Sequence, residues 1–291
     1  MASGRDLRRR IRSIGNTAQI TRAMQMVAAS KMRKAQLAAI EVRPFARLVY
    51  RLQRVATTHA TDSTDFTHPL LETRDVRRRA IILVGSDKGL CGALNSNLFR
   101  VAGRFDPHTT RFITAGRKAA QFVARTRREL VAEFPYGDTP RFPESRAIAA
   151  MARDLFVKGE VDAVQIVATR FVNTLVQQPV AIELLPIGDI TGVDIPGLPT
   201  PPAGAADPTE FLFEPDVSDV LGFLLGHYLN IVVHLALLNA KASEQSARMV
   251  SMKGATDNAA EMIKDLTLVY NKLRQGRITQ ELLEIAGGQA G

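Results

Sequence analysis

The sequence predicts a central α/β domain combined with a long antiparallel coiled coil that its N- and C-terminal helices form. Two long seven-residue repeats of apolar residues, one at each end of the chain, predict the two helices. Between them, short apolar runs alternate with amphipathic segments, as in an α/β sheet. The 291 residues, 46% of them hydrophobic, suffice for one sizeable core with extensions.

Residues 1–58 are predicted to form the first long helix. In steps of three and four from Leu7 to Ala56, twelve of fifteen positions are apolar, and six of them are alanine. A seam so rich in alanine lets a partner helix approach closely, so the natural partner is the other long apolar stripe. Pro44 lies inside the pattern and should kink the helix or remove one hydrogen bond.

The first helix is also strongly basic. Residues 1–58 hold 13 Lys and Arg against Asp6 and Glu41, a net charge of +11, whereas the whole chain carries +9. These cations form either a solvated helix face or a track for an acidic surface of protein or nucleic acid. The alternative function is therefore a basic coiled-coil protein that binds nucleic acid through residues 5–54, although that segment has few aromatic residues for stacking on bases.

The middle of the chain alternates between strands and helices. A polar connector, residues 59–78, precedes a buried strand at 80–84, a glycine-rich loop and a helix that ends near Gly103. Residues 79–187 should therefore form a Rossmann-like domain with a mostly parallel sheet and helices on both faces. Its other expected elements are a strand at 112–114, helices at 117–127 and 145–157, and strands at 161–171 and 176–185 joined by a turn around Asn173.

The remainder is a proline-rich strap followed by the second long helix. Residues 186–215 carry seven of the 14 prolines, and residues 188–215 are expected to form a stiff, extended return. Residues 216–291 form the C-terminal helix, whose apolar stripe runs from Leu221 to Leu273 and is broken only by Gln245 and Thr256. A repeat of this length favours a supercoil with another helix.

One part of the C-terminal helix passes a length test for a membrane span. Residues 220–240 contain no charged side chain. His227, Asn230, His234 and Asn239 are costly in lipid, and the apolar stripe continues into a charged segment. We therefore expect this stretch to be buried on the α/β domain, with a membrane span as the alternative.

The sequence offers little catalytic chemistry. The loop glycines Gly85, Gly89 and Gly92 match neither dinucleotide-binding nor Walker spacing, which favours a tight structural turn over a nucleotide hydrolase. Cys91 is the only cysteine, and a buried small residue is a better interpretation than a reactive thiol. The five histidines lack metal-ligand spacing, so His227 and His234 are expected to be core or interface residues. We expect no catalytic residue, no cofactor and no metal.

Four segments resemble one known family. They are NTAQITRAMQMVAASKMR (16–33), SDKGLCGALN (86–95), ASEQSARMVSMKGATDN (242–258) and ITQELLEI (278–285). All four are similar to segments of the γ subunits of bacterial F-type ATP synthases, and they occur in the family's order. The resemblance spans both helices and the domain between them.

The resemblance implies a mechanical function. It implies the central rotor shaft of a proton-translocating ATP synthase, with sodium as the alternative coupling ion. The implied partners are the ring of α and β subunits, the ε subunit and the membrane c-ring, without nucleic acid. Such a shaft has no catalytic site of its own and is a peripheral protein on the cytoplasmic face of the bacterial inner membrane.

The resemblance also implies which residues contact other subunits. It places Arg274, Gln275, Thr279 and Glu281 where the shaft meets loops of the α and β subunits. Met24 and Arg248 are placed near the lever region of the β subunit. Lys31, Arg33 and Lys34 lie on the basic flank, where we expect shallow, screened attraction to acidic β-subunit segments.

Overall fold

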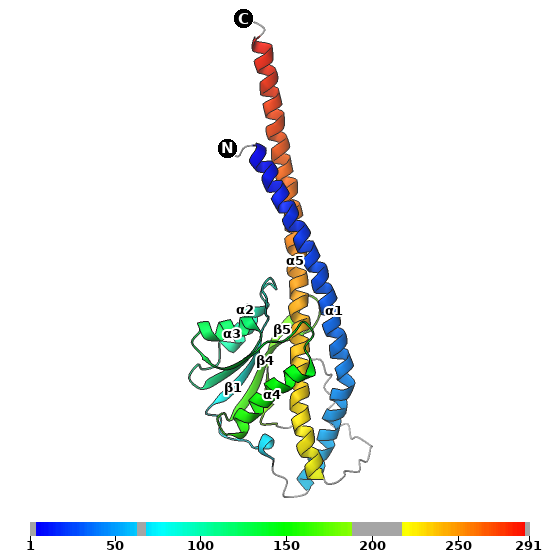
Figure 1. Cartoon of the computed structure of the whole chain (residues 1–291), viewed down its shortest axis with the longest axis vertical. Coiled ribbons are helices and arrows are strands. Elements are labelled where there is room, and N and C mark those ends of the chain that lie inside the picture. Colours follow the sequence, from blue (N-terminus) through cyan, green and yellow to red (C-terminus); the bar gives the residue numbers. More distant parts are fainter. Residues whose placement is uncertain (1–3, 63–67, 188–216, 289–291) are drawn as a thin grey trace. The chain divides into compact units, whose positions relative to one another are not determined.

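The computed structural model describes residues 4–62, 68–187 and 217–288. The contacts divide the chain into two compact units, residues 1–28 with 248–291 and residues 29–247, and both long helices contribute to each unit. Figure 1 labels the elements. In chain order they are α1 (Gly4–Asp62), η1 (Pro69–Leu71), β1 (Arg79–Val84), α2 (Leu94–Ala102), β2 (Thr110–Ala115), α3 (Arg117–Arg125), β3 (Glu129–Phe134), α4 (Phe142–Val157), β4 (Ala163–Phe171), β5 (Gln177–Leu185) and α5 (Val217–Gly288).

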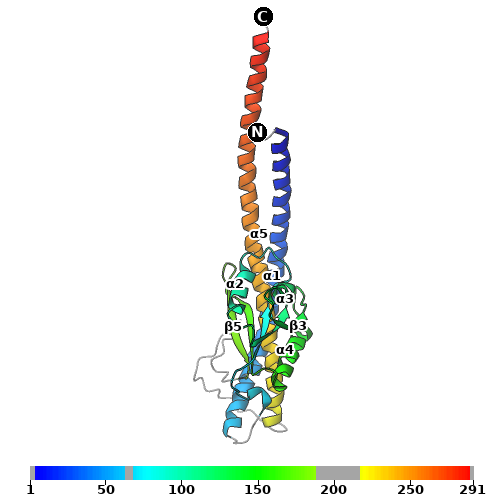
Figure 2. The same cartoon turned by 90° about the vertical axis from the view of Figure 1, so that its left-hand side faces the viewer.

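The smaller unit is a pair of antiparallel helices, the first part of α1 and the last part of α5 (Figure 2). The hydroxyl oxygens of Thr21 and Thr256 lie 2.7 Å apart, and either can donate to the other. The Arg8 guanidinium carbon lies 5.1 Å from the centre of the Tyr270 ring. Residue numbers therefore rise along α1 as they fall along α5, which confirms the predicted antiparallel pairing. The seam positions Leu7, Thr21, Met252 and Ala259 are buried.

The larger unit contains a five-stranded sheet in the order β3-β2-β1-β4-β5. β1 pairs in parallel with β2 and β4, and β2 pairs in parallel with β3, while β4 and β5 form an antiparallel hairpin. Asn173 shapes the hairpin turn, because its side-chain oxygen accepts hydrogen bonds from the backbone N–H groups of Leu175 and Val176. The order confirms the Rossmann-like expectation.

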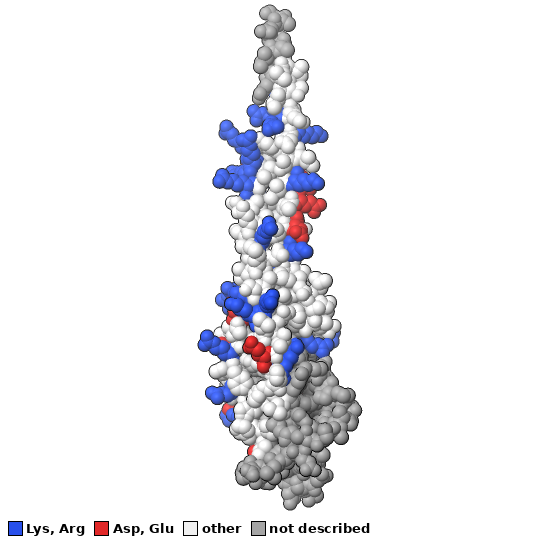
Figure 3. Space-filling view, turned by 90° about the vertical axis from the view of Figure 1, so that its right-hand side faces the viewer, with Lys and Arg blue, Asp and Glu red and all other residues white. Residues whose placement is uncertain are grey.

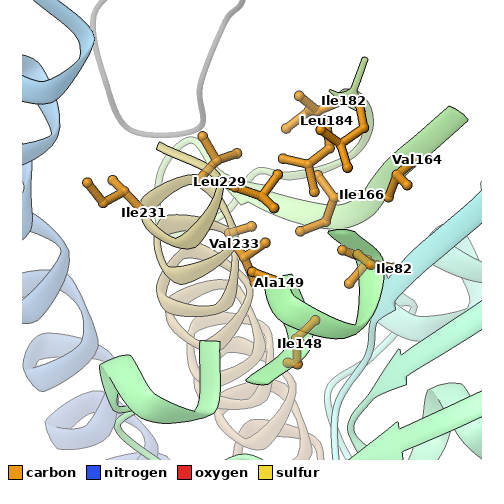
Figure 4. Close-up of a cluster of buried hydrophobic side chains, with 14 of the residues drawn as sticks. Ile82, Ile148, Ala149, Val164, Ile166, Ile182, Leu184, Leu229, Ile231 and Val233 are labelled. Atoms are coloured by element: carbon orange, nitrogen blue, oxygen red, sulfur yellow. The ribbon is translucent and has the colours of Figure 1, made fainter. Parts of the chain in front are cut away.

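The sheet has an apolar core on each face. Because side chains alternate along a strand, Ile81 and Leu83 of β1 pack with α2 and α3, while Ile82 and Val84 join the opposite core. Figure 4 shows that opposite core, where Ile148 and Ala149 of α4 and Leu229 and Val233 of α5 meet side chains of β1, β4 and β5. α5 is therefore a structural part of the α/β domain.

Within this unit, α5 is covered on all sides. Every residue from 231 to 246 is buried. The sheet and α4 cover one side of the helix, and the alanine seam of α1 lies on the other, where Ala35, Ala39 and Ala46 are at most 5% exposed. The stretch Gly222–Gln280 is long and apolar enough to cross a membrane, but 78% of its apolar window is buried inside the structure. This burial confirms the interpretation of the stretch as a core helix.

The predicted elements differ from the structure in one strand that was not predicted and in the positions of several ends; α4, for example, begins at Phe142 rather than at residue 145. The strand β3 was not predicted, because its apolar run from Leu130 to Ala132 is short and none of its residues is buried: three are exposed and three are half-buried. α1 extends to Asp62, four residues past its predicted end, and includes Pro44. The predicted strap at 188–215 lies outside the described residues, and the other domain boundaries remain predictions.

Candidate functional site: the helix pair and the loop edge of the sheet

In the smaller unit, α5 continues past the described start of α1. A methyl group added to Gly4 would lie 3.8 Å from the Tyr270 ring, so the first described residue of α1 is opposite Tyr270. Beyond it, all residues from 272 to 280 are exposed. The apolar side chains of Leu273 and Ile278 are 38% and 48% exposed there, and Leu282 is 61% exposed. This last part of α5 thus presents apolar surface that no described residue covers.

Four predicted contact residues lie on this exposed end of α5. Arg274, Gln275 and Thr279 are exposed, and Thr279 donates its hydroxyl hydrogen to the Gln275 carbonyl oxygen at 3.0 Å. Glu281 belongs to the same helix, and its side chain lies outside the described residues. The side chains of Gln275 and Thr279 are one helical turn apart, so they share a face.

The other two predicted residues of this unit are less accessible. Met24 of α1 is half-buried, and Arg248 of α5 is only 8% exposed. Met24 is adjacent to the seam position Gln25 and contributes to the covered side of α1.

The predicted basic flank divides into two kinds of residue. Arg33 and Lys34 are exposed on α1, and Figure 3 shows Lys and Arg gathered along this helix. Lys31 instead donates a hydrogen bond to the carboxylate of Asp138, with 2.6 Å between Nζ and Oδ2. Lys31 therefore has a partner within its own chain, which the sequence analysis did not predict.

The glycine-rich loop after β1 is tied into the fold. Ser86 donates its hydroxyl hydrogen to the Lys88 carbonyl oxygen and accepts a hydrogen bond from the Asn95 amide. A side chain at Gly116, whose φ is +92°, would collide with the carbonyl oxygen of Gly85. Cys91, 2% exposed, is buried as expected and accepts a hydrogen bond from the same Asn95 amide. These contacts fix the start of the loop and Cys91, whereas residues 88–90, 92 and 93 are exposed.

The C-terminal segment of α5 in the larger unit lies over the edge of the sheet. In Rossmann-like sheets, ligands bind outside the carboxyl ends of the strands where the strand order reverses, here between β1 and β4. Ser243 donates to the carbonyl oxygen of Thr169 in β4 at 3.3 Å, and Ser246 donates to that of Thr174 in the hairpin turn at 2.7 Å. The helix therefore covers the β4 side of this edge.

His234 is a core residue, as expected. Its Nδ1 atom lies 2.8 Å from the hydroxyl oxygen of Ser145 in α4, and its ring meets the edge of Phe142. Burial lowers the pKa of His234 below its ordinary value of 6.5, while the charge of Glu144 acts in the opposite direction. Among the described residues, no group of three or more His, Cys, Asp or Glu side chains is arranged to hold a metal ion.

The predicted contact residues thus do not converge on one pocket. They are distributed along the two helices, in both units, which suits surfaces that meet other chains rather than a small ligand. Asp138, Tyr136 and Lys241 form a polar cluster that sequence reasoning missed. The one indication in the sequence is Lys241, a charge placed directly after a long uncharged stretch.

Comparisons with known proteins agree with this arrangement. A family model described as ATP synthase matches residues 3–291. The chain is 46% identical to the ATP synthase gamma chain of Opitutus terrae, covering 99% of this chain and 98% of that one. It is 43% identical to the gamma chain of Desulfitobacterium hafniense, with the same coverage. The chain belongs to the ATP synthase gamma chain family.

Solved structures share the fold of this family member. One is the Euglena gracilis mitochondrial ATP synthase described as OSCP/F1/c-ring, with a TM-score of 0.65 at 21% identity, covering 99% of this chain and 93% of that one. Another is the central stalk and c-ring of the Tetrahymena thermophila mitochondrial enzyme, with a TM-score of 0.59 at 24% identity, covering 81% of this chain and 99% of that one. Both confirm the predicted combination of long helices and α/β domain.

Proposed function

We propose that this chain is the central rotor shaft of a bacterial, proton-translocating F-type ATP synthase. Its full-length similarity to bacterial gamma chains carries the proposal. The paired helices provide a stiff shaft, and the α/β domain provides a base for contacts with the c-ring and the ε subunit. Rotation of the c-ring turns the shaft, whose asymmetry drives the β-subunit sites through their states in sequence. The chain acts as a peripheral protein on the cytoplasmic face of the inner membrane.

The chain contributes no catalytic site of its own in this proposal. Two features support this. Ser86 of the glycine-rich loop is hydrogen-bonded within the chain, to Lys88 and Asn95. In addition, α5 covers the β4 side of the sheet edge where Rossmann-like domains bind ligands. Nucleotide is bound by the α and β subunits. The comparisons give no support to the alternative of a nucleic-acid-binding coiled coil, because the whole chain matches the gamma chain family.

The exposed end of α5 is the proposed bearing inside the ring of α and β subunits. Arg274, Gln275, Thr279 and Glu281 contribute to it, and the exposed apolar residues Leu273 and Ile278 can pack against ring loops. Met24 and Arg248 are proposed to stiffen the shaft at the height of the β-subunit lever. Arg33 and Lys34 attract acidic β-subunit segments, each exposed pair contributing on the order of 1 kcal/mol or less.

The bearing can be tested with substitutions that leave the isolated chain folded. Gln275→Leu and Thr279→Val change only exposed side chains, so the isolated chain should stay folded. Both variants should weaken assembly with α and β subunits, or lower ATP-driven proton pumping, because they remove polar groups that face the ring in this proposal. Thr267→Val is the matched control, because Thr267 makes the same kind of hydroxyl bond, to the Ile263 carbonyl oxygen, in the paired part of α5. Unchanged assembly and pumping in both bearing variants would refute the assignment.

A further inference from the structure

One carboxylate of the α/β domain meets a lysine from each long helix. Asp138 lies in the loop between β3 and α4. Its Oδ2 atom is 2.6 Å from Nζ of Lys31 in α1, and its Oδ1 atom is 3.9 Å from Nζ of Lys241 in α5. All three residues belong to the larger unit. The loop therefore makes charge contacts with both helices through a single side chain.

Lys241 makes this arrangement more than a surface ion pair. Its side chain is 2% exposed, so its ammonium group has lost almost all of its water and depends on partners within the protein. Glu244, one turn along α5, lies 3.1 Å away and is also buried. The face of the Tyr136 ring lies 4.7 Å from the same ammonium. Tyr136 and Asp138 both belong to the loop, so the loop supplies two of the three groups that surround the Lys241 ammonium.

The loop is in turn fastened to the sheet. The Tyr136 hydroxyl donates a hydrogen bond of 2.8 Å to the carbonyl oxygen of Gly85, directly after β1. Tyr136 is only 4% exposed. A continuous series of contacts thus runs from the end of the central strand through Tyr136 to the loop, and through Asp138 to α1 and α5.

Neighbouring groups lower the pKa of Asp138. The hydrogen bond from Lys31, followed by the charges of Lys241 and Lys88, lowers the pKa of the Asp138 carboxyl below its ordinary value of 3.8, while partial burial acts against them. The pair with Lys31 is partly exposed and alone would contribute little to stability. Lys241, whose nearer ion-pair partner is the buried Glu244, adds a longer contact of 3.9 Å to the second oxygen.

We propose that Asp138 is a positioning residue that clamps α1 to the α/β domain, in which α5 is already a core helix, so that load passes between the domain and α1 without slip. This inference rests on the proposed rotary function. The 2.6 Å hydrogen bond joins α1 to the loop, and sliding of α1 along the domain would break it. The 3.9 Å contact with Lys241 adds attraction to the same carboxylate from α5. The clamp also assigns Lys31 a role within the chain, distinct from the exposed Arg33 and Lys34.

The test in the assembled enzyme is Asp138→Asn, which keeps the size of the side chain and removes its charge. The measurement is protons pumped per ATP hydrolysed in ATP synthase reconstituted into vesicles. We expect this ratio to fall by at least a third while hydrolysis continues, and Asp138→Glu to restore part of it. Glu133→Gln is the matched control, since Glu133 is an exposed carboxylate five residues earlier in the chain. It should leave the ratio unchanged.

The outcomes separate this inference from the proposed function. Failure of the unmodified chain to assemble with α and β subunits would refute the proposed function. Normal assembly with an unchanged pumping ratio in Asp138→Asn would refute only the clamp. An equal loss of hydrolysis and pumping would also overturn it, because that result describes a destabilised subunit rather than slip.

A second measurement uses the isolated full chain. Exchange of the amide hydrogens of Tyr136, Gly137, Asp138, Thr139 and Arg141 should be about three- to tenfold faster in Asp138→Asn, because the loop loses its contact with α1. Lys31→Met should accelerate exchange of the same amide hydrogens. The double variant should exchange no faster than Asp138→Asn alone, since both substitutions break the same contact between Lys31 and Asp138. Arg33→Met should add nothing. Additive effects of Asp138→Asn and Lys31→Met would contradict the clamp.

Discussion

The two parts of α5 differ in what surrounds the same helix. Between residues 231 and 246, every side chain is buried, since the sheet and α4 lie on one side and α1 on the other. From Lys253 to Tyr270, only the side facing α1 is covered, and residues 272–280 are exposed all round. The sequence follows this change, since residues 220–240 carry no charge whereas residues 248–281 carry many. One helix thus serves first as a domain core, then as half of a helix pair, and finally as an exposed end.

The largest expected effect comes from removing a side chain from the fully surrounded part. Leu237 is 0% exposed, so Leu237→Ala should lower the free energy of unfolding by about 2–5 kcal/mol, because it leaves a cavity. Leu268 on the same helix is 62% exposed, and Leu268→Ala should change the value by no more than about 0.5 kcal/mol. Urea unfolding of the full chain, followed by far-UV circular dichroism, measures both. Equal losses would show that the two parts of the helix are packed alike.

The next effect probes how closely α1 approaches α5. Ala35 is 0% exposed in the alanine seam, and Ala35→Leu should cost about 1–3 kcal/mol, because the larger side chain forces the helices apart. Ala23, also in α1, is exposed, so Ala23→Leu is the matched control and should be nearly neutral. The same urea unfolding experiment compares them. A neutral Ala35→Leu variant would mean that the seam has room to spare.

Periodicity predicted the helices well because it reports exclusion from water. All the predicted seam positions from Leu7 to Val49 are buried or half-buried, and so are those of α5 from Leu224 to Tyr270. Leu273 continues the pattern but is exposed, because the described part of α1 begins opposite Tyr270. A repeat indicates a face that avoids water, without indicating which chain covers it.

The elements that the sequence did not predict depend on long-range contacts. β3 is an edge strand with three exposed and three half-buried residues, and its pairing with β2 is a backbone property that side-chain patterns do not report. The partnership of Asp138 with Lys31 and Lys241 joins three segments that only the fold brings together. The contacts proposed for the end of α5 come from family resemblance alone and remain predictions.

The smallest expected effect concerns a titrating group inside the surrounded part of α5. His234 is 6% exposed and bonded to Ser145, and its pKa is lowered in the folded state by burial, against the opposing charge of Glu144. As the pH falls below 6.5, the unfolded chain therefore binds a proton before the folded chain does. The stability that neutral His234 allows is fully present above pH 6.5 and is lost as the pH falls through the lowered pKa. The slope is at most about 1.4 kcal/mol per pH unit.

His234→Asn should remove this pH dependence, because asparagine retains a polar group near Ser145 and does not titrate. Urea unfolding at several pH values between 7 and 5 should give a shallower profile for this variant than for the unmodified chain, at the cost of some stability at pH 7. His68, whose pKa burial also lowers, should account for part of the slope that remains. An equally steep profile in His234→Asn would mean that the covered stretch of α5 accommodates a charged imidazole, and that its burial is less complete than its surroundings indicate.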